Sequence, residues 1–529
     1  MMIRTAKANL RVLIPTVFLG VVATPLFAQK TYTAASCNLS DVQAAINQEL
    51  ANSVDGDVIS IPAGTCTWTG TTAVKASFTH SVTIQGAGAV SATDGGAGTT
   101  GSDRTIILDN FSNNGHSILG LSATAGKTVR ITGIAFLTNA STAATNNGVI
   151  GFGGQSTVRV DHCHFYVYLV SILGFHGGMT GVVDHNYFNS PAGQLTTDIM
   201  IKNGMTWNGD TGGQGDRSWA DTEHWGGSQF LFIEDNRFYD GSVGDSNSGA
   251  ARYVFRYNTV LTSTVDYDGG HFFNHGLSPS RGRSTRAAEV YQNVFTRPGP
   301  VGGGNVPYSL NGGTLLYWGN RITQYRSGLQ IDYTRKDGST NYNYGLPPSG
   351  WGLCNATSAF TNWDGPTSGY PCLDAPGRGA GDLLSGSFPN VVNTRTGTIA
   401  HPQQALSPIY IWGNTFTPSG GYSGTAMVSV NASMVAANRD YYQSVGAVAG
   451  STGVVSGVRS ARPSSCTAGP GGNTPGVGYW ATDESTLYVC TATNTWTAYY
   501  TPYTYPHPLT QGTPISKPLP PTNVITAVH

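Results

Sequence analysis

A short strand-like pattern recurs along the chain and restricts the possible folds more than any other feature. Its copies are "VRITGIAF", "VRVDHCHF", "GVVDHNYF", "LFIEDNRF", "YVFRYNTV", "AEVYQNVF", "LLYWGNRI" and "IYIWGNTF". Their sixth residues are Ile134, Cys163, Asn186, Asn236, Asn258, Asn293, Asn320 and Asn414. The steps run from 22 residues (Asn236 to Asn258) to 94 residues (Asn320 to Asn414). Such repeats are typical of solenoids, so short steps predict single coils, and long steps predict skipped coils or inserted loops.

The asparagine has a physical role at the corner of such a coil. It tolerates the left-handed backbone conformation and hydrogen-bonds neighbouring peptide groups, and stacked asparagines form ladders. The residues three positions earlier are apolar or aromatic and predict a core row: Val160, Val183, Ile233, Phe255, Val290, Tyr317 and Ile411. Because side chains alternate along a strand, the residues two positions earlier form an outward row: Asp161, Asp184, Glu234, Arg256, Tyr291, Trp318 and Trp412.

The asparagine-bend repeats and the segment "DVQAAINQELANSVDGDVISIPAGTCTW" resemble the pectate-lyase-like superfamily of right-handed parallel β-helices. The resemblance covers roughly residues 31–440. It implies an all-β, right-handed parallel β-helix with an N-terminal helical cap, for which "LSDVQAAINQEL" is the candidate, with Asp41 or Ser40 as N-cap. The superfamily contains lyases, hydrolases, esterases and adhesins. The chain has neither the polygalacturonase motif set nor a complete motif of a named lyase family.

The N-terminus and the charge indicate an exported protein. Residues 1–28 have a basic start, a proline-interrupted apolar stretch and small residues before a cleavage site after Ala28, as in a signal peptide. Removing them changes the formal charge from −1 to about −4, which argues against a nucleic-acid binder. We therefore expect a secreted or periplasmic monomer without a membrane span.

The cysteines and the C-terminal composition divide the rest of the chain. Of seven cysteines, six form local pairs that predict disulfides, with Cys163 left as a buried apolar residue: Cys37–Cys66, Cys354–Cys372 and Cys466–Cys490. We assign residues 29–460 to the β-helix. Residues 461–529 are predicted to form a linker, a small β-hairpin module and an aromatic-proline tail. This tail either packs on the solenoid or attaches to a surface or a sugar.

The outward row suggests two binding sites. Exposed aromatic side chains are suitable platforms for sugar rings, so the predicted substrate-binding residues are Arg252, Arg256, Tyr291, Trp318 and Trp412. Clustered carboxylates can hold Ca²⁺, for which the candidates are Asp161, Asp184 and Glu234. The alternative is that an insertion covers the row and that its tryptophans are buried.

An arginine-rich loop gives the candidate catalytic residues. Arg281, Arg283 and Arg286 lie within six positions, near His275, in a chain with only 28 Lys and Arg among 529 residues. Arginine binds carboxylates through two parallel hydrogen bonds. In a uronic-acid polymer, arginines would neutralise the enolate of a β-elimination, and His275 would act as the base. The resemblance implies instead that Arg283 or Arg286 is the base.

Three alternatives stay open. The arginines could form ion pairs with Asp245, Asp266 and Asp268 and have no catalytic role. Asp245 and Glu223 could be the paired carboxylates of a glycoside hydrolase. The chain could also be a carbohydrate-binding adhesin without chemistry.

Overall fold

The structure is a computed structural model. It describes residues 29–70, 74–90, 103–111, 117–138, 149–154, 156–166, 171–190, 197–202, 222–246, 250–262, 272–274, 284–298, 306–332, 374–382, 391–392, 399–400, 403–431, 435–447 and 452–511.

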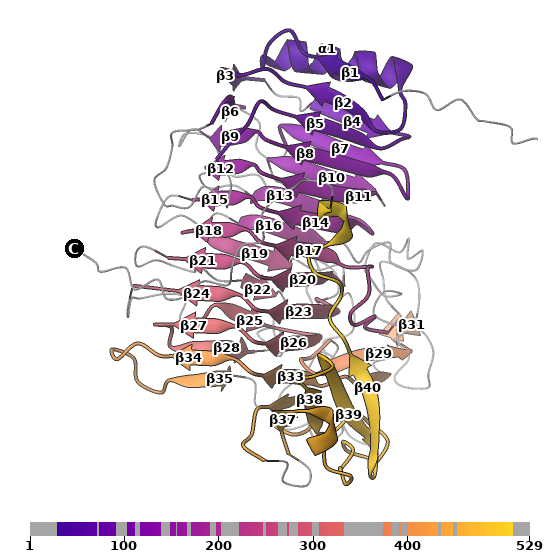
Figure 1. Cartoon of the computed structure of the whole chain (residues 1–529), viewed down its shortest axis with the longest axis vertical. Helices are drawn as coiled ribbons and strands as arrows, with labels where there is room; N and C mark the ends of the chain where they lie inside the picture. The colour runs from indigo at the N-terminus through magenta and orange to yellow at the C-terminus, as the bar shows by residue number, and fades with distance from the viewer. Residues whose placement is uncertain are drawn as a thin grey trace, which may run out of the picture.

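Three long parallel sheets wrap around one axis and form a right-handed parallel β-helix (Figure 1). Sheet A has 12 strands: β1 (Thr31–Thr33), β2 (Asp57–Ser60), β5 (Val82–Gln85), β8 (Thr128–Thr132), β11 (Thr157–Asp161), β14 (Thr180–Asp184), β17 (Leu231–Glu234), β20 (Arg252–Arg256), β23 (Ala287–Tyr291), β26 (Thr314–Trp318), β33 (Ile409–Trp412) and β36 (Tyr441–Gln443). Sheet B has 10 strands: β3 (Gly64–Trp68), β6 (Thr105–Asp109), β9 (Ala135–Thr138), β12 (His164–Tyr166), β15 (Tyr187–Asn189), β18 (Arg237–Tyr239), β21 (Thr259–Leu261), β24 (Val294–Thr296), β27 (Arg321–Thr323) and β34 (Thr415–Thr417).

Sheet C also has 10 strands: β4 (Val74–Phe78), β7 (Leu119–Ala123), β10 (Ile150–Gly154), β13 (Ser171–His176), β16 (Thr197–Lys202), β19 (Ser242–Ser246), β22 (Phe272–Asn274), β25 (Tyr308–Leu310), β28 (Ser327–Ile331) and β35 (Ala426–Val430). From β4 onward, most coils run from sheet C to sheet A and then to sheet B. The predicted fold class is therefore confirmed.

Every copy of the repeat supplies one strand of sheet A and the bend into sheet B. Asn320 and Asn414, the most widely spaced pair, lie in neighbouring coils, because β26 pairs directly with β33. The residues between β28 and β33 are therefore an insertion within one coil. This insertion contains two small antiparallel pairs, β29 (Arg378–Asp382) with β32 (Gln403–Leu406) and β30 (Val391–Val392) with β31 (Ile399–Ala400). Of the two explanations for long steps, insertion applies here and skipping does not.

The asparagines form the expected ladder. The backbone N–H of Asn236 donates to Oδ1 of Asn258 at 3.0 Å, and that of Asn258 donates to Oδ1 of Asn293 at 2.9 Å. The asparagine itself is not the left-handed residue, which corrects one part of the sequence interpretation. Positive φ occurs one position earlier, at 57° for Asp235 and 56° for Tyr257. The asparagine side chain is thereby directed into the turn to satisfy buried peptide groups.

The core row is confirmed. The side chains of Val160, Val183, Ile233, Phe255 and Val290 are all 0% exposed. Stacked phenylalanines continue the core under sheet B, with ring centroids 5.0 Å apart for Phe165 and Phe188 and 4.7 Å apart for Phe188 and Phe238. Such repeated contacts between coils stabilise a solenoid.

A helix closes the N-terminal end, as the resemblance implied. Helix α1 (Leu39–Asn52) buries Val42, Ala45 and Ile46 against the first coils. Its N-cap is Asn38 and not Asp41 or Ser40, and Asn38 makes no side-chain capping bond. The helix therefore begins slightly earlier than its first acidic residue suggested.

Two of the predicted disulfides are present, Cys37–Cys66 and Cys466–Cys490, and Cys163 is free and buried. Burial raises the pKa of the Cys163 thiol, as expected for an unreactive core residue. The pair Cys354–Cys372 lies outside the described residues. The two disulfides indicate an oxidising compartment. Among the described residues, no helix is long and apolar enough to cross a membrane.

The C-terminal part forms a separate mixed sheet at the end of the β-helix. Its strands are β37 (Val454–Gly457), β38 (Gly478–Ala481), β39 (Thr486–Ala492) and β40 (Thr495–Tyr500). The chain continues into the short helix η5 (Pro508–Thr510). We call residues 454–511 the C-terminal cover. In Figure 1 the yellow segment rises from β40 across sheet A to the level of β14.

Candidate functional site

The outward row of sheet A is continuous but not open to solvent. Strand register places its members side by side: Asp161, Asp184, Glu234, Arg256, Tyr291, Trp318 and Trp412. The most exposed of them, Trp318, is 8% exposed, and the acidic members are 0% exposed. The C-terminal cover lies across this face and accounts for the burial of most of the row.

Backbone groups of the C-terminal cover bind the charged side chains of the row. Arg256 donates from Nη1 to the carbonyl of Tyr503 at 2.8 Å and from Nη2 to that of Thr504 at 2.9 Å. The backbone N–H of His507 donates to Glu234 at 2.7 Å. Arg256 Nε also donates to Glu234 at 2.6 Å. The row and the cover therefore share one buried network.

The acidic end of the row is bound by arginines. Asp161 accepts two hydrogen bonds of 2.7 Å from Arg130, and Asp184 accepts two of 3.0 Å from Arg159. Burial raises the pKa of Asp161, but hydrogen bonds from Arg130 and His162 outweigh it and hold that pKa well below its ordinary value. Each carboxylate thus has a guanidinium counter-ion.

This arrangement does not suit the predicted calcium site at Asp161, Asp184 and Glu234. Calcium requires several oxygens that converge on one point, whereas these oxygens accept from guanidinium groups. In the part of the chain that the structure describes, no group of three or more His, Cys, Asp or Glu side chains is arranged to hold a metal.

The aromatic end of the row does not offer the predicted sugar platform. The ring centroids of Tyr291 and Trp318 lie 4.5 Å apart, and those of Trp318 and Trp412 lie 5.6 Å apart. Trp480 of the C-terminal cover packs on this stack, 5.0 Å from Trp318. Arg252 and Arg256 are also 0% exposed. The alternative of a covered row fits, with the C-terminal module rather than an insertion as the cover.

A second polar group, buried except for the half-buried Glu223, lies where several strands of sheet A begin. We call Glu223, Arg252, Arg286 and Ser407 the loop-edge cluster. Glu223 accepts from Arg286 Nη2 at 3.0 Å and from the Ser407 hydroxyl at 2.5 Å. Arg252 Nη1 donates to the carbonyl of Glu223 at 2.9 Å. Glu223 therefore connects three other segments of the chain, two through its carboxylate and one through its backbone carbonyl.

Chain connectivity explains why these segments meet. Strand β20 begins at Arg252, and Arg286 directly precedes β23, so both lie at the connection from sheet C to sheet A. Asp374, inside the long insertion, lies at the same connection, because it accepts from the backbone N–H of Ser284, two residues before Arg286, at 3.1 Å. The long insertions of these coils thus start or end at the same edge of the solenoid.

The electrostatics of the cluster favour a fixed ion pair. Burial raises the pKa of Glu223, but the charge of Arg286 and the hydrogen bond from Ser407 outweigh it, and the net pKa is lowered. Glu223 is therefore ionised at neutral pH and unsuited to donate a proton. Burial and the charge of Glu223 raise the pKa of the nearby Tyr499 hydroxyl, which stays protonated.

Only part of the predicted catalytic set can be located. His275, Arg281 and Arg283 lie in residues 275–283, outside the described residues. Arg286 is 0% exposed and belongs to the loop-edge cluster. Asp245 lies in β19 of sheet C. It is paired in register with Met200 of β16 and Phe273 of β22, and the same register position is occupied by Gly151 in β10.

Sequence reasoning identified Glu223 and Arg286 but not the residues that join them. Ser407 is 184 positions from Glu223, and Asp374 is 90 positions from Ser284. No local pattern signals such pairings. The sequence indicates an aromatic tail, but the partners of its backbone carbonyls have no sequence signature.

The fold and the sites described above define the chain as a parallel β-helix protein with a C-terminal β module packed on one face. Comparison with protein-family models, with curated proteins and with solved structures finds no match. Parallel β-helices serve as polysaccharide lyases, hydrolases and adhesins, so the scaffold alone leaves the activity open.

Proposed function

We propose that the protein is a secreted polysaccharide-degrading enzyme, related in scaffold to pectate lyases, that cleaves an acidic glycan by β-elimination. Its site would lie at the connection from sheet C to sheet A. The observation that carries the proposal is the loop-edge cluster. Arg286 is anchored there by Glu223, directly after the segment with His275, Arg281 and Arg283.

The chemistry needs cations and a base. A base removes the proton on the carbon next to the uronate carboxylate, the glycosidic C–O bond at the neighbouring carbon breaks, and a C=C bond forms between the two carbons. The leaving oxygen takes up a proton. Arginines bound to the carboxylate stabilise the enolate charge that develops.

We assign a separate role in this reaction to each residue of the arginine-rich loop. Arg281 and Arg283 would bind the carboxylate, and His275, whose ordinary pKa is near neutrality, would be the base. The superfamily resemblance implies Arg283 or Arg286 as the base instead. Arg286 is fully buried against Glu223, so we assign it a positioning role for the loop rather than contact with the polymer.

A substrate panel tests the reaction class. The secreted protein is incubated with polygalacturonate, alginate, xylan and glucan, and ultraviolet absorbance and reducing ends are followed together. Elimination predicts new absorbance on an acidic polymer. Reducing ends without absorbance would indicate hydrolysis and move the assignment to Glu223 and Asp245. Retention without either signal would leave a binding protein.

Replacing Arg283 tests the site. We expect Arg283→Ala to lose on the order of a hundredfold or more in rate, the scale of one lost oxyanion donor. Arg283→Lys should also be poor, because a point charge does not replace the planar fork. Both are measured as initial rates per folded molecule. Normal turnover with lowered stability would show instead that this arginine has a structural role.

A further inference from the structure

The two faces of the C-terminal sheet differ. Trp480, Leu487 and Val489 belong to the apolar cluster that packs on sheet A. Tyr479 and Tyr488 belong to a separate cluster, and Trp496 packs against both clusters. Because side chains alternate along a strand, one face of the sheet closes the β-helix and the other points away from it.

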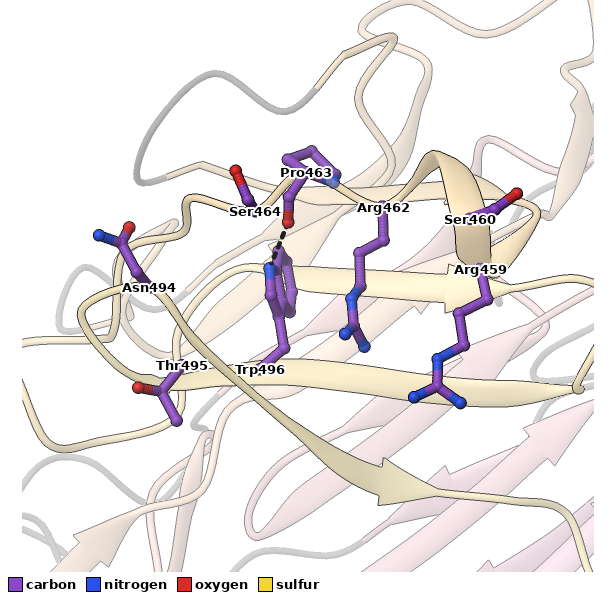
Figure 2. Close-up of a pocket in the computed structure, with 8 residues that line it drawn as sticks. All are labelled: Arg459, Ser460, Arg462, Pro463, Ser464, Asn494, Thr495 and Trp496. Atoms are coloured by element: carbon purple, nitrogen blue, oxygen red, sulfur yellow. Dashed lines mark hydrogen bonds between the residues drawn. The ribbon is translucent and has the colours of Figure 1, made fainter.

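A cavity of about 590 Å³ lies on the face that points away (Figure 2). It is lined by Arg459, Ser460, Arg462, Pro463, Ser464, Asn494, Thr495 and Trp496. Figure 2 shows the Arg462 side chain extended beside the Trp496 ring, with Arg459 next along the same wall. The lining thus combines two cations, a flat aromatic ring and several polar groups.

Arg462 stacks on two aromatic rings and makes no direct ion pair, while Glu484, which pairs with Arg459, lies within electrostatic range of it. Its guanidinium carbon lies 4.3 Å from the ring centroid of Tyr488 and 5.6 Å from that of Trp496. Among the ion pairs of the described residues, none includes Arg462. Arg459, in contrast, pairs with Glu484 at 2.8 Å. The charge of Arg462 is therefore oriented by stacking, which keeps its hydrogen-bonding edge for another acceptor.

Trp496 is fixed in place by a hydrogen bond and by a neighbouring disulfide. Its indole N–H donates to the carbonyl of Pro463 at 2.8 Å. Trp496 pairs in register with Cys490, whose disulfide to Cys466 ties β39 to the segment that carries Pro463. A pre-ordered aromatic beside an oriented guanidinium loses little conformational freedom when a ligand binds.

We propose that this cavity is a second, non-catalytic site that binds an anionic saccharide. Arg462 takes the carboxylate of a uronic acid, and Trp496 packs on the sugar ring. The site shares with the proposed function only the choice of an acidic glycan. Its role would be to hold the polymer while other parts of the chain act on it.

Affinity electrophoresis of the full chain tests this site. Gels contain polygalacturonate or its methyl ester, and polymer affinity is taken from the retardation. Wild type should be retarded by polygalacturonate and not by the ester. Arg462→Ala should weaken the affinity at least about tenfold, the scale of a lost charge-assisted hydrogen-bond pair. Arg462→Lys should weaken it similarly and keep the wild-type melting temperature.

Arg321→Ala is the matched control, because Arg321 is an exposed arginine on β27 of sheet B. It should be retarded like wild type. The inference is overturned if wild type is not retarded, if the ester retards it equally, or if Arg462→Ala keeps its affinity. Cleavage of a short soluble oligosaccharide is assayed separately. It should be unchanged in Arg462→Ala, and absence of cleavage in wild type would count against the proposed function only.

Discussion

On the outer face of sheet A, Arg256 lies between Glu234 and the peptide carbonyls of the C-terminal cover. At the loop-edge cluster, Arg286 donates to Glu223 and follows, in the sequence, the segment that contains His275, Arg281 and Arg283. Both arginines are 0% exposed and ion-paired. The two arginines differ in their position in the sequence. The C-terminal cover reaches both, through backbone carbonyls at Arg256 and through Tyr499, which hydrogen-bonds with Ser407 beside Glu223. Only Arg286 directly follows a long polar loop in the sequence.

The comparison shows that a row of charged and aromatic residues does not by itself identify a binding face. The outward row of sheet A has the composition of a sugar site, yet its side chains contact the C-terminal cover of the same chain. The loop-edge cluster has a less regular sequence pattern but lies where several insertions meet. We therefore propose that the function lies at the loop edge, and that the contacts of the outward row serve stability.

The largest effect on the covered face is expected from Arg256→Ala. It leaves the Glu234 carboxylate buried without its counter-ion and removes the donors to Tyr503 and Thr504. Breaking a buried ion pair costs about 3–5 kcal/mol. Denaturant unfolding should show this loss. Arg321→Ala on the exposed surface should change the free energy of unfolding by less than about 0.5 kcal/mol. Equal small effects of both changes would contradict a tightly packed cover.

A second test uses the pH dependence of the unfolding free energy that Glu289 causes. The Glu289 carboxylate accepts from the Tyr500 hydroxyl of the cover at 2.9 Å and from the backbone N–H of Gly226 at 2.8 Å. Burial raises its pKa from 4.5 to about 7. The folded chain therefore holds this proton more tightly than the unfolded chain. The stabilisation is complete below about pH 4.5 and is lost as the pH rises through about 7.

Glu289→Gln removes this titration. The difference in unfolding free energy between variant and wild type should shift in favour of the variant by roughly 3 kcal/mol between pH 4.5 and pH 8. Unfolding curves at both pH values measure it. A difference that is independent of pH would mean that Glu289 is not buried by the cover.

Substitutions in the asparagine ladder, which is separate from both arginine sites, should lower the free energy of unfolding by a smaller amount. Asn258 accepts from the backbone N–H of Asn236 and donates to the carbonyl of Ile233 at 2.9 Å. Asn258→Ala should cost about 2 kcal/mol, because buried peptide groups lose their partners. Asn414→Ala should cost less, since Asn414 is only half-buried and water can replace its side chain. The reverse order in thermal unfolding would contradict a ladder that stabilises mainly its buried centre.

The solenoid could be predicted from the repeat because successive coils place the same residue types at the same positions. Apolar residues such as Val183 and Ile233 recur at the inward position, and an asparagine recurs at the bends from Asn186 onward. Local spacing also predicted Cys37–Cys66 and Cys466–Cys490. These features depend on residues close in sequence or on a periodic pattern.

The sites were harder to predict because their contacts join distant segments. The outward direction of Trp318 follows from alternation, but its burial depends on Trp480, which comes from a different part of the fold. Glu223 and Ser407 meet only because an insertion returns to the same edge. Alternation along a strand gives the face of a residue and not what covers that face.

The most direct test of the account compares Arg256→Ala with Arg283→Ala on the acidic polymer that the wild type cleaves. Initial rate per folded molecule and free energy of unfolding are measured for both. The account predicts that Arg256→Ala loses several kcal/mol of stability and keeps its turnover. It predicts that Arg283→Ala keeps its stability and loses about a hundredfold or more in turnover. Lost turnover in folded Arg256→Ala together with normal turnover in Arg283→Ala would contradict it and place the chemistry on the covered face.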